Sequence, residues 1–327
     1  MKKWIWSVVL IVAILLVGCS RYEEPESLPE AVTLAVATDI HYLSPELTDG
    51  GSCFLSSIEN GDGKMVHYIE EITESFLSGL KKVRPDYLIL SGDLTFNGAL
   101  ESHRDLTKKL HALEKYGVQV LVIPGNHDVD SDYAVSFQGN GTQSVPALDS
   151  GGFETMYQDF GPDLAISRDE STFSYTVQAA EDLRIILLDA NSYGVGWIKE
   201  STMAWLEKEL DAAREVGDEV ITVSHQNLYA HNGLLSFGYQ LYNGDQLQNL
   251  LEEYEVLCQL SGHIHAQSIV KGSVPEIVTS SIAVSPIQYG VLEFSENTLT
   301  YHVRQADISG WAEEQGYTDA NLLNFED

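Results

Sequence analysis

The heptapeptide YLILSGD, residues 87–93, shows the pattern that decides the fold of this chain. Four consecutive apolar residues are typical of a buried strand, and the polar Ser-Gly-Asp ends that strand. The stretch before it, residues 65–83, has apolar residues at helical spacing, and Pro85 prevents this helix from continuing. A helix followed at once by a buried strand is the unit from which α/β folds are built.

The alternation of strands and helices continues on both sides of this heptapeptide. Further strands are predicted within residues 31–41, 118–128, 184–191, 219–227 and 256–265. Further helices are predicted within residues 106–117, 202–216 and 245–254. Only strand-like stretches follow residue 265, at 268–272, 276–281, 289–294 and 299–306. We therefore expect an α/β fold with a mixed sheet or a second sheet.

Two long stretches lack any clear periodicity. Residues 43–63 are rich in Gly, Ser, Asp and Asn, and we expect them to form a long loop. Residues 130–172 carry Gly, Ser, Asp and Pro. Because a stretch of this length inside a compact domain is usually functional, we expect it to have a functional role, for instance as an active-site cap.

The first 30 residues are predicted to target the chain rather than to fold with the rest. Lys2 and Lys3 precede an apolar stretch of about 14 residues, which is short for a membrane span and ends in small residues at Cys19. Leu16 to Cys19 also resembles the bacterial lipobox, whose cysteine is lipidated; a plain signal or an uncleaved anchor helix is the alternative. We therefore expect an extracytoplasmic protein anchored to a bacterial membrane through lipidated Cys19.

This interpretation divides the chain into four segments. We expect a signal peptide at residues 1–19, a polar tether at 20–30, a folded domain at 31–305 and an acidic tail at 306–327. The tail either docks as a last helix or hangs free. Cys53 and Cys258 could pair in an oxidising compartment, but Cys258 lies in an apolar strand-like stretch that is typical of a buried thiol.

The charge of the chain excludes one class of partner. The 327 residues carry a formal net charge of −31, which becomes about −33 without residues 1–19, because that segment contains two lysines. A protein this acidic repels polyanions, so we do not expect long nucleic acids as partners.

Polar residues that bind metals follow nearly every predicted strand. They form five groups: Asp39-Ile40-His41, Ser91-Gly92-Asp93, Gly125-Asn126-His127-Asp128, Ser224-His225 and Gly262-His263-Ile264-His265. Each group alone has an ordinary explanation as a turn, a helix cap or a packed histidine. Together they place five of the ten histidines and three carboxylates at consecutive strand ends, where open α/β sheets bind ligands. We therefore predict that the five groups converge on one site.

The ordered set D-x-H, G-D, G-N-H-D, H and G-H-x-H resembles that of the calcineurin-like metallophosphoesterases, and it runs from Asp39 to His265. Within that superfamily, LSGDLTFNGALESHRDL (90–106), VIPGNHDVD (122–130) and LSGHIH (260–265) are most similar to bacterial class III cyclic-nucleotide phosphodiesterases, some of which are extracytoplasmic lipoproteins. The resemblance implies an αββα sandwich of two mixed sheets flanked by helices, with a dimetal site at the carboxyl ends of strands. It also makes residues 31–305 the catalytic domain.

The resemblance further implies how the ligands divide between two metal ions. Metal 1 would take Asp39, His41, Asp93 and His265, and metal 2 would take Asp93, Asn126, His225 and His263. His127 would donate to the transition state or the leaving oxygen, and Asp128 would hold the His127 ring in the right tautomer. Carboxylates and imidazoles without thiolates suit Mn, Fe or Zn, as two divalent ions or as Fe³⁺ with a divalent ion.

Two departures from the family pattern concern the pocket. The proline that often follows the fourth-motif histidine is absent from SHQNLYAHN (224–232), and a long insert follows His41. Five residues after His225 are candidates either for lining the pocket or for packing at its rim: Asn227, Tyr229, His231, Tyr239 and Tyr242.

The leading expectation is an enzyme that hydrolyses small phosphate esters, above all phosphodiesters such as cyclic nucleotides. A hydroxide bridging the two metal ions would attack phosphorus, with His127 as the acid. The enzymatic alternative is a phosphomonoesterase or nucleotidase with the same core. The non-catalytic alternative is a surface lipoprotein that binds a ligand on a retired enzyme scaffold, although a retired enzyme loses ligands and this chain keeps all of those named above.

Overall fold

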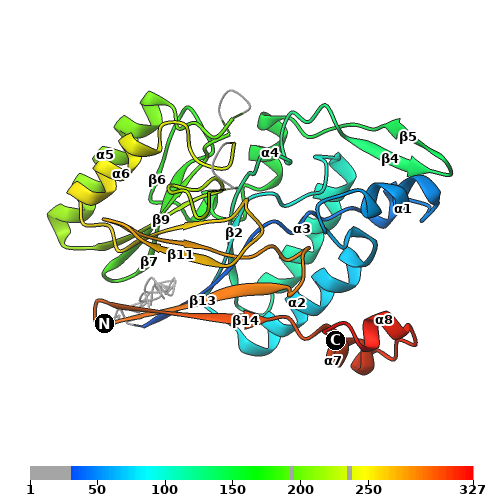
Figure 1. Ribbon diagram of the computed structural model, residues 1–327. Helices are drawn as coiled ribbons and strands as arrows, with labels where there is room; N and C mark the ends of the chain where they lie inside the picture. Colours follow the sequence, from blue (N-terminus) through cyan, green and yellow to red (C-terminus); the bar gives the residue numbers. More distant parts are fainter. Residues whose placement is uncertain (1–30, 192–194, 234–237, 327) are drawn as a thin grey trace, which may run out of the picture.

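The computed structural model describes residues 31–191, 195–233 and 238–326, which form two large β-sheets with helices on both outer sides (Figure 1). The first sheet has the strand order β14-β13-β1-β2-β3, and the second has the order β11-β12-β10-β9-β8-β7-β6. The strands of the first sheet are β1 Val32–Ala37, β2 Tyr87–Ser91, β3 Gln119–Ile123, β13 Gln288–Ser295 and β14 Thr298–Gln305. Those of the second are β6 Ser167–Arg168, β7 Tyr175–Ala180, β8 Leu183–Leu188, β9 Glu219–Ser224, β10 Cys258–Ser261, β11 Ser268–Lys271 and β12 Pro275–Val278.

Both sheets are mixed, because parallel strands in the middle carry antiparallel strands at one or both edges. In the first sheet β1, β2 and β3 are parallel, while β13 and β14 run antiparallel beside β1. In the second sheet β8, β9, β10 and β12 are parallel, while β6, β7 and β11 pair antiparallel. The carboxyl ends of the parallel strands therefore share one edge in each sheet, which is where the predicted site groups follow.

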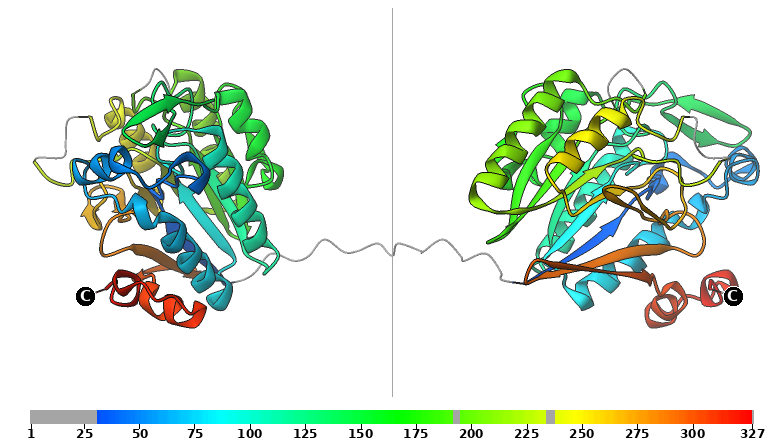
Figure 2. Two further views of the ribbon diagram at one scale, coloured as in Figure 1. Left: turned by 90° about the vertical axis from the view of Figure 1, so that its right-hand side faces the viewer. Right: turned by 60° about the vertical axis from the view of Figure 1, so that its left-hand side comes forward.

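Two pairs of helices complete a four-layered arrangement (Figures 1 and 2). The first sheet is covered by α2 (Ile69–Val83) and α3 (Leu100–Glu114), and the second by α5 (Glu200–Val216) and α6 (Gly244–Glu253). One apolar cluster joins the facing sheets and continues under α2 and α3, and a second lies under α5 and α6. The predicted αββα sandwich of two mixed sheets is confirmed.

The predicted long loop at residues 43–63 is wrong. This segment contains a 3₁₀ helix, η1 (Pro45–Leu47), and an α-helix, α1 (Ser52–Glu59). The side chain of Phe54 is buried, and its ring centroid lies 5.4 Å from that of Phe137. This contact between distant segments orders α1, and the local composition gives no sign of it.

The segment 130–172 has several short elements. It forms a hairpin of β4 (Val135–Gln138) and β5 (Gly141–Ser144), followed by α4 (Ser150–Met156), η3 (Pro162–Leu164) and β6. Figure 1 shows the hairpin on the same side of the molecule as α1.

The acidic tail docks rather than hanging free. Helices α7 (Ile308–Gln315) and α8 (Ala320–Leu323) follow β14, and α7 packs against α2. The Ser75 hydroxyl on α2 donates to the Asp307 carbonyl at 2.9 Å, and Lys82 on α2 lies 2.9 Å from Glu314.

Two further sequence predictions concern the cysteines and the membrane. Cys53 and Cys258 are free thiols, and burial raises the pKa of Cys258 to about 12. Within the described residues, no helix combines the length and apolarity needed to cross a membrane. The predicted signal peptide and tether lie outside the described residues.

Candidate metal centre

The five predicted groups follow five strands and converge where the ends of the two sheets meet. Asp39 and His41 follow β1, Asp93 follows β2, Asn126 and His127 follow β3, His225 follows β9, and His263 and His265 follow β10. The first three strands belong to one sheet and the last two to the other. The side chains lie close enough to form three overlapping groups of metal-binding atoms.

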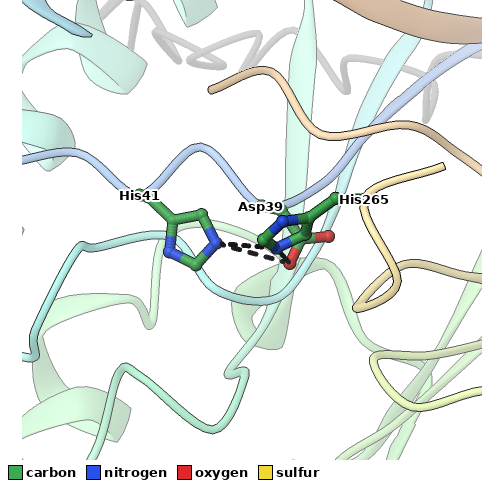
Figure 3. A group of neighbouring side chains, drawn as sticks. All are labelled: Asp39, His41 and His265. Atoms are coloured by element: carbon green, nitrogen blue, oxygen red, sulfur yellow. Dashed lines mark hydrogen bonds and ion pairs between the residues drawn. The ribbon is translucent and has the colours of Figure 1, made fainter. Parts of the chain in front are cut away.

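The first group consists of Asp39, His41 and His265 (Figure 3). Nε2 of His265 lies 3.2 Å from Oδ1 of Asp39 and 3.1 Å from Nε2 of His41. Nε2 of His41 lies 3.7 Å from the same Asp39 oxygen, and both residues are fully buried. Two imidazole nitrogens and one carboxylate oxygen thus face one point, as the ligands of a single cation would.

The second group consists of Asp93, His225 and His263. Nε2 of His225 lies 3.4 Å from Oδ2 of Asp93 and 3.1 Å from Oδ1 of Asn126, and the rings of His225 and His263 are 4.8 Å apart. The same Asp93 oxygen lies 3.9 Å from Nε2 of His41. Asp93 therefore stands between the two groups, as a bridging ligand would. The structure brings together all the predicted ligands, and their assignment to two ions stays a prediction.

The unsatisfied atoms of the site fit metal ions. Oδ2 of Asp39 accepts hydrogen bonds from the Thr38 hydroxyl at 2.7 Å and the His263 N–H at 2.9 Å, whereas Oδ1 is buried, accepts no hydrogen bond and faces the His265 ring nitrogen at 3.2 Å. A buried carboxylate oxygen needs a compensating charge or donor, which a cation would supply. The His225 ring donates from Nδ1 to the Ser91 carbonyl at 2.9 Å, which turns Nε2 toward Asp93 and Asn126, where a metal would bind.

The backbone at the site adopts an uncommon conformation. Five predicted ligands have φ between 47° and 70°, in the left-handed region: Asp39, His41, Asp93, His263 and His265. Non-glycine residues rarely adopt this conformation, and those that do concentrate at functional sites. Gly262 allows a close approach beside them, because a Cβ there would lie 2.0 Å from the Thr38 hydroxyl oxygen. The chain thus departs from regular strand geometry in three of the five ligand loops, those after β1, β2 and β10.

His127 lies beside Asp93 and forms the third group with Asp93 and His41. Its Nε2 is 3.9 Å from Oδ2 of Asp93, and its side chain is 35% exposed. The ring N–H at Nδ1 donates to the Phe96 carbonyl at 2.8 Å. Since a carbonyl oxygen only accepts, this bond fixes the tautomer and presents Nε2 to the site.

Asp128 does not make the contact predicted for it. Its carboxylate is fully buried and accepts the backbone N–H groups of Leu94 at 3.0 Å, Thr95 at 2.9 Å and Gly125 at 2.7 Å. The prediction that it orients the His127 ring is therefore wrong, because its oxygens are turned to backbone donors. Asp128 instead ties the loop after β2 to the loop after β3.

Three candidates for the pocket are paired within the fold: the Asn227 amide and the His231 ring are buried, and Tyr229 is half-buried. The Asn227 amide is buried and donates to the Gly262 carbonyl at 2.9 Å. The Tyr229 hydroxyl donates to a backbone carbonyl of the turn before β12 at 3.0 Å. The His231 side chain is 1% exposed, and its Nε2 lies 2.9 Å from Glu276. A pocket-lining role for His231 is wrong, because its ring is paired inside the fold.

The two tyrosines lie nearer the surface. The Tyr239 ring centroid is 5.2 Å from that of His263, so this ring stands against a predicted ligand. Tyr242 is 53% exposed. Contact of either ring with a substrate stays a prediction.

A charged pair beside the first group was missed by the sequence analysis. Oδ2 of Asp62 lies 3.9 Å from Nδ1 of His265, and Nζ of Lys64 lies 2.6 Å from the same oxygen. Asp62 belongs to the insert after His41, and Lys64 follows that insert; the path of this part of the chain could not be inferred from its composition. It brings one carboxylate and one ammonium group to the edge of the site.

A large acidic cavity reaches Asn126, the one predicted ligand in its lining. It has a volume of about 1110 Å³ and is lined by Asn126 together with residues of the 130–172 segment. Its charged lining residues are Asp130, Asp132, Glu154, Asp169, Glu170 and Asp189, with Arg168 and Lys199 as the cations. Six carboxylates against two cations give a formal charge of −4. The segment that was expected to be functional, for instance as an active-site cap, forms a wall of this cavity.

We predict that metal binding releases a proton from His225. Burial alone would lower the pKa of His225, but the Asp93 carboxylate outweighs burial and raises the pKa to about 9. Burial lowers the pKa of His263 to about 4, so that ring stays neutral near pH 7. Below pH 9 a metal ion must displace the His225 proton. The affinity of the protein for metal 2 should therefore fall by up to about tenfold for each unit by which the pH is lowered.

Isothermal titration of the metal-free protein with Mn²⁺ at pH 7 tests this linkage. Repeating the titration in buffers of different ionisation enthalpy gives the number of protons released. At least one proton per chain is expected. Binding without proton release would contradict the linkage.

Comparisons with known proteins agree with this geometry. A family model described as calcineurin-like phosphoesterase matches residues 32–267. A protein of Arcobacter nitrofigilis named "Probable glycerophosphodiester phosphodiesterase" is 26% identical over 250 residues, which cover 72% of this chain and 77% of that protein. One of Moraxella catarrhalis named "Probable cyclic nucleotide phosphodiesterase" is 26% identical over 188 residues, or 57% of this chain and 60% of that protein.

Solved structures share the fold at lower sequence identity. A dimetal phosphatase from Danio rerio aligns with a TM-score of 0.55 and 14% identity, over 84% of this chain and 96% of that one. A purple acid phosphatase from yellow lupin aligns with a TM-score of 0.57 and 18% identity, over 86% of this chain and 52% of that one. The family match spans the domain that holds every predicted ligand, and the chain therefore belongs to the calcineurin-like phosphoesterase family.

Proposed function

We propose that this protein hydrolyses small phosphodiesters, cyclic nucleotides among them, at a dimetal site. The observation that carries the proposal is the complete ligand set around Asp93, with His127 beside it. The names of the bacterial relatives support a diester substrate. A retired scaffold that only binds a ligand would not need to keep unsatisfied ligand atoms such as Oδ1 of Asp39 buried in its core.

The metal ions, Asp93 and His127 have different roles in the proposed reaction. When bound, two metal ions supply Lewis acidity and lower the pKa of a water molecule that attacks phosphorus. Asp93 sets the spacing of the two metal sites. His127, held through Nδ1 by the Phe96 carbonyl, turns Nε2 toward the site, where it carries a proton to the departing oxygen.

The site would be electropositive within an acidic chain. Two divalent ions bring four positive charges, while Asp39 and Asp93 remove two, and the neutral Asn126 removes none. The remaining positive charge attracts a small phosphate ester, although the chain as a whole has a net charge of −31.

The acidic cavity favours diesters over monoesters. A phosphodiester carries one negative charge and has a second ester group to place, whereas a monoester carries close to two charges at neutral pH. The cavity beside Asn126 has room for a second ester group, and its formal charge of −4 disfavours the additional charge of a monoester.

We expect kcat/KM for bis(4-nitrophenyl) phosphate to exceed that for 4-nitrophenyl phosphate by at least about tenfold, since like charges near a surface repel by about 1 kcal/mol or more. The double variant Asp132→Asn, Glu170→Gln removes two carboxylates from the cavity lining and should narrow this ratio. Release of nitrophenolate measures kcat/KM for both substrates, in the wild type and in the double variant. A preference of the wild type for the monoester would favour a phosphomonoesterase or nucleotidase instead.

We also propose that the protein is extracytoplasmic and lipid-anchored through Cys19, as the N-terminal sequence suggests. Cys19→Ser should move the protein from the membrane fraction of the bacterial host to the released fraction, without changing turnover. The same distribution of wild type and variant between these fractions would argue against lipidation.

A further inference from the structure

Glu276 on β12 has no exposed surface and is surrounded by four hydrogen-bond donors. Its Oε1 accepts from the Leu228 N–H at 2.7 Å and from the Ser261 hydroxyl at 2.7 Å. Its Oε2 accepts from the Tyr229 N–H at 2.8 Å and lies 2.9 Å from Nε2 of His231. A buried carboxylate needs partners for both oxygens, and here each oxygen has two.

Two of the segments that Glu276 joins carry predicted ligands of metal 2. Residues 228–231 belong to the loop that starts after His225, and Ser261 is the last residue of β10, two positions before His263. The segments also bind each other directly, because the Gly262 N–H donates to the His225 carbonyl at 3.0 Å.

Asn227 completes the connection between these segments. Its Nδ2 donates to the Ser261 hydroxyl oxygen at 3.1 Å and to the Gly262 carbonyl at 2.9 Å. The Ser261 hydroxyl therefore accepts from Asn227 and donates to Glu276. An unbroken set of hydrogen bonds thus runs from a carboxylate on β12 to the backbone beside both imidazoles of metal 2.

We propose that Glu276 is a positioning residue that holds the loop after His225 against the end of β10, and thereby sets the spacing of the His225 and His263 rings. It fixes the loop that lacks the family's proline. The inference rests on the ligand assignment made under the proposed function. It does not depend on which ester is hydrolysed.

Glu276→Gln tests this role with little change in shape. The amide keeps one acceptor but turns an NH₂ group toward donors, so bonds to the loop are lost. We expect the affinity for one of two Mn²⁺ ions to fall by about 10- to 100-fold, as for other residues that orient metal ligands, while the other affinity changes less than about threefold. Titration calorimetry and the electron paramagnetic resonance signal of free Mn²⁺ measure both affinities.

Two further variants separate positioning from general stability. Glu209→Gln changes another buried carboxylate, which accepts from Ser167 away from the site, and should leave both affinities unchanged. Ser261→Ala removes one of the four bonds to Glu276 and should weaken the same Mn²⁺ by about two- to tenfold. If Glu276→Gln does not fold, the Mn²⁺ affinities of Ser261→Ala test the positioning role of Glu276 instead.

The proposal is overturned if Glu276→Gln folds and binds both ions like the wild type, or if it weakens both ions equally. It is likewise overturned if Glu276→Gln does not fold and Ser261→Ala binds both ions normally. These readouts do not involve turnover. A wild type that binds two Mn²⁺ ions but hydrolyses no phosphodiester would contradict the proposed function and leave the role of Glu276 intact.

Discussion

Asp93→Ala should abolish both metal binding and diester hydrolysis. Oδ2 of Asp93 lies 3.4 Å from the His225 nitrogen and 3.9 Å from the His41 nitrogen, so one substitution removes the ligand that the two predicted metal sites share. Even residues that only orient metal ligands change metal affinity by about 10- to 100-fold. We therefore expect the loss of a shared ligand to lower kcat/KM by more than about a hundredfold. Metal analysis should find no metal in the purified variant and two ions per chain in the wild type.

Two controls keep this result specific. Asp163→Ala removes an exposed carboxylate of η3 and should leave metal content and turnover unchanged. Asp93→Asn keeps the shape of the side chain but not its charge, and should also lose activity. An Asp93→Ala variant with full turnover would contradict the whole ligand scheme.

His127→Ala should retain both metals and lose rate. The ring stands beside Asp93 but is oriented by the Phe96 carbonyl, so its removal leaves the ligand atoms in place. Loss of a general acid costs about 10²- to 10⁴-fold in rate. The loss should be largest for alkyl esters and small for nitrophenyl esters, because nitrophenolate leaves without a proton. Comparison of kcat for these two leaving groups measures the effect.

His302→Ala, which removes an exposed histidine of β14, is the matched control and should behave like the wild type. If His127→Ala loses one metal ion, the ring is a ligand and the assigned role is wrong. If the loss is the same for alkyl and nitrophenyl esters, His127 stabilises charge at the transition state instead of protonating the leaving oxygen.

The site residues could be predicted because each follows a buried strand directly. Parallel strands place their carboxyl ends at one edge, so Asp39, Asp93 and Asn126 had to lie near one another once β1, β2 and β3 were recognised. The same holds for His225 and His263 after β9 and β10. Local sequence determines where each strand ends, and the parallel arrangement of the strands then places the residues that follow them at one edge of the sheet.

Contacts made by loops could not be predicted in this way. His231 is only six residues from His225, yet it is buried by Glu276, which lies 45 residues further along the chain. Asp128 follows His127 in sequence, but its carboxylate turns to the backbone N–H groups of Leu94 and Thr95, in the loop after β2, and of Gly125 in its own loop. Lys64 follows α1 in the chain and pairs with Asp62 at the edge of the site, and α1 itself packs through Phe54 against Phe137. In each case the partner is set by packing between distant segments, which leaves no periodic pattern in the sequence.

The central claim is that two metal ions act together on one phosphodiester. The most direct test is to remove all metal with a chelator, add Mn²⁺ back in known amounts and follow the hydrolysis of bis(4-nitrophenyl) phosphate. We predict no turnover without metal and a rise that is complete only at two equivalents of Mn²⁺ per chain. Full activity in the metal-free protein, or saturation at one equivalent, would contradict the account.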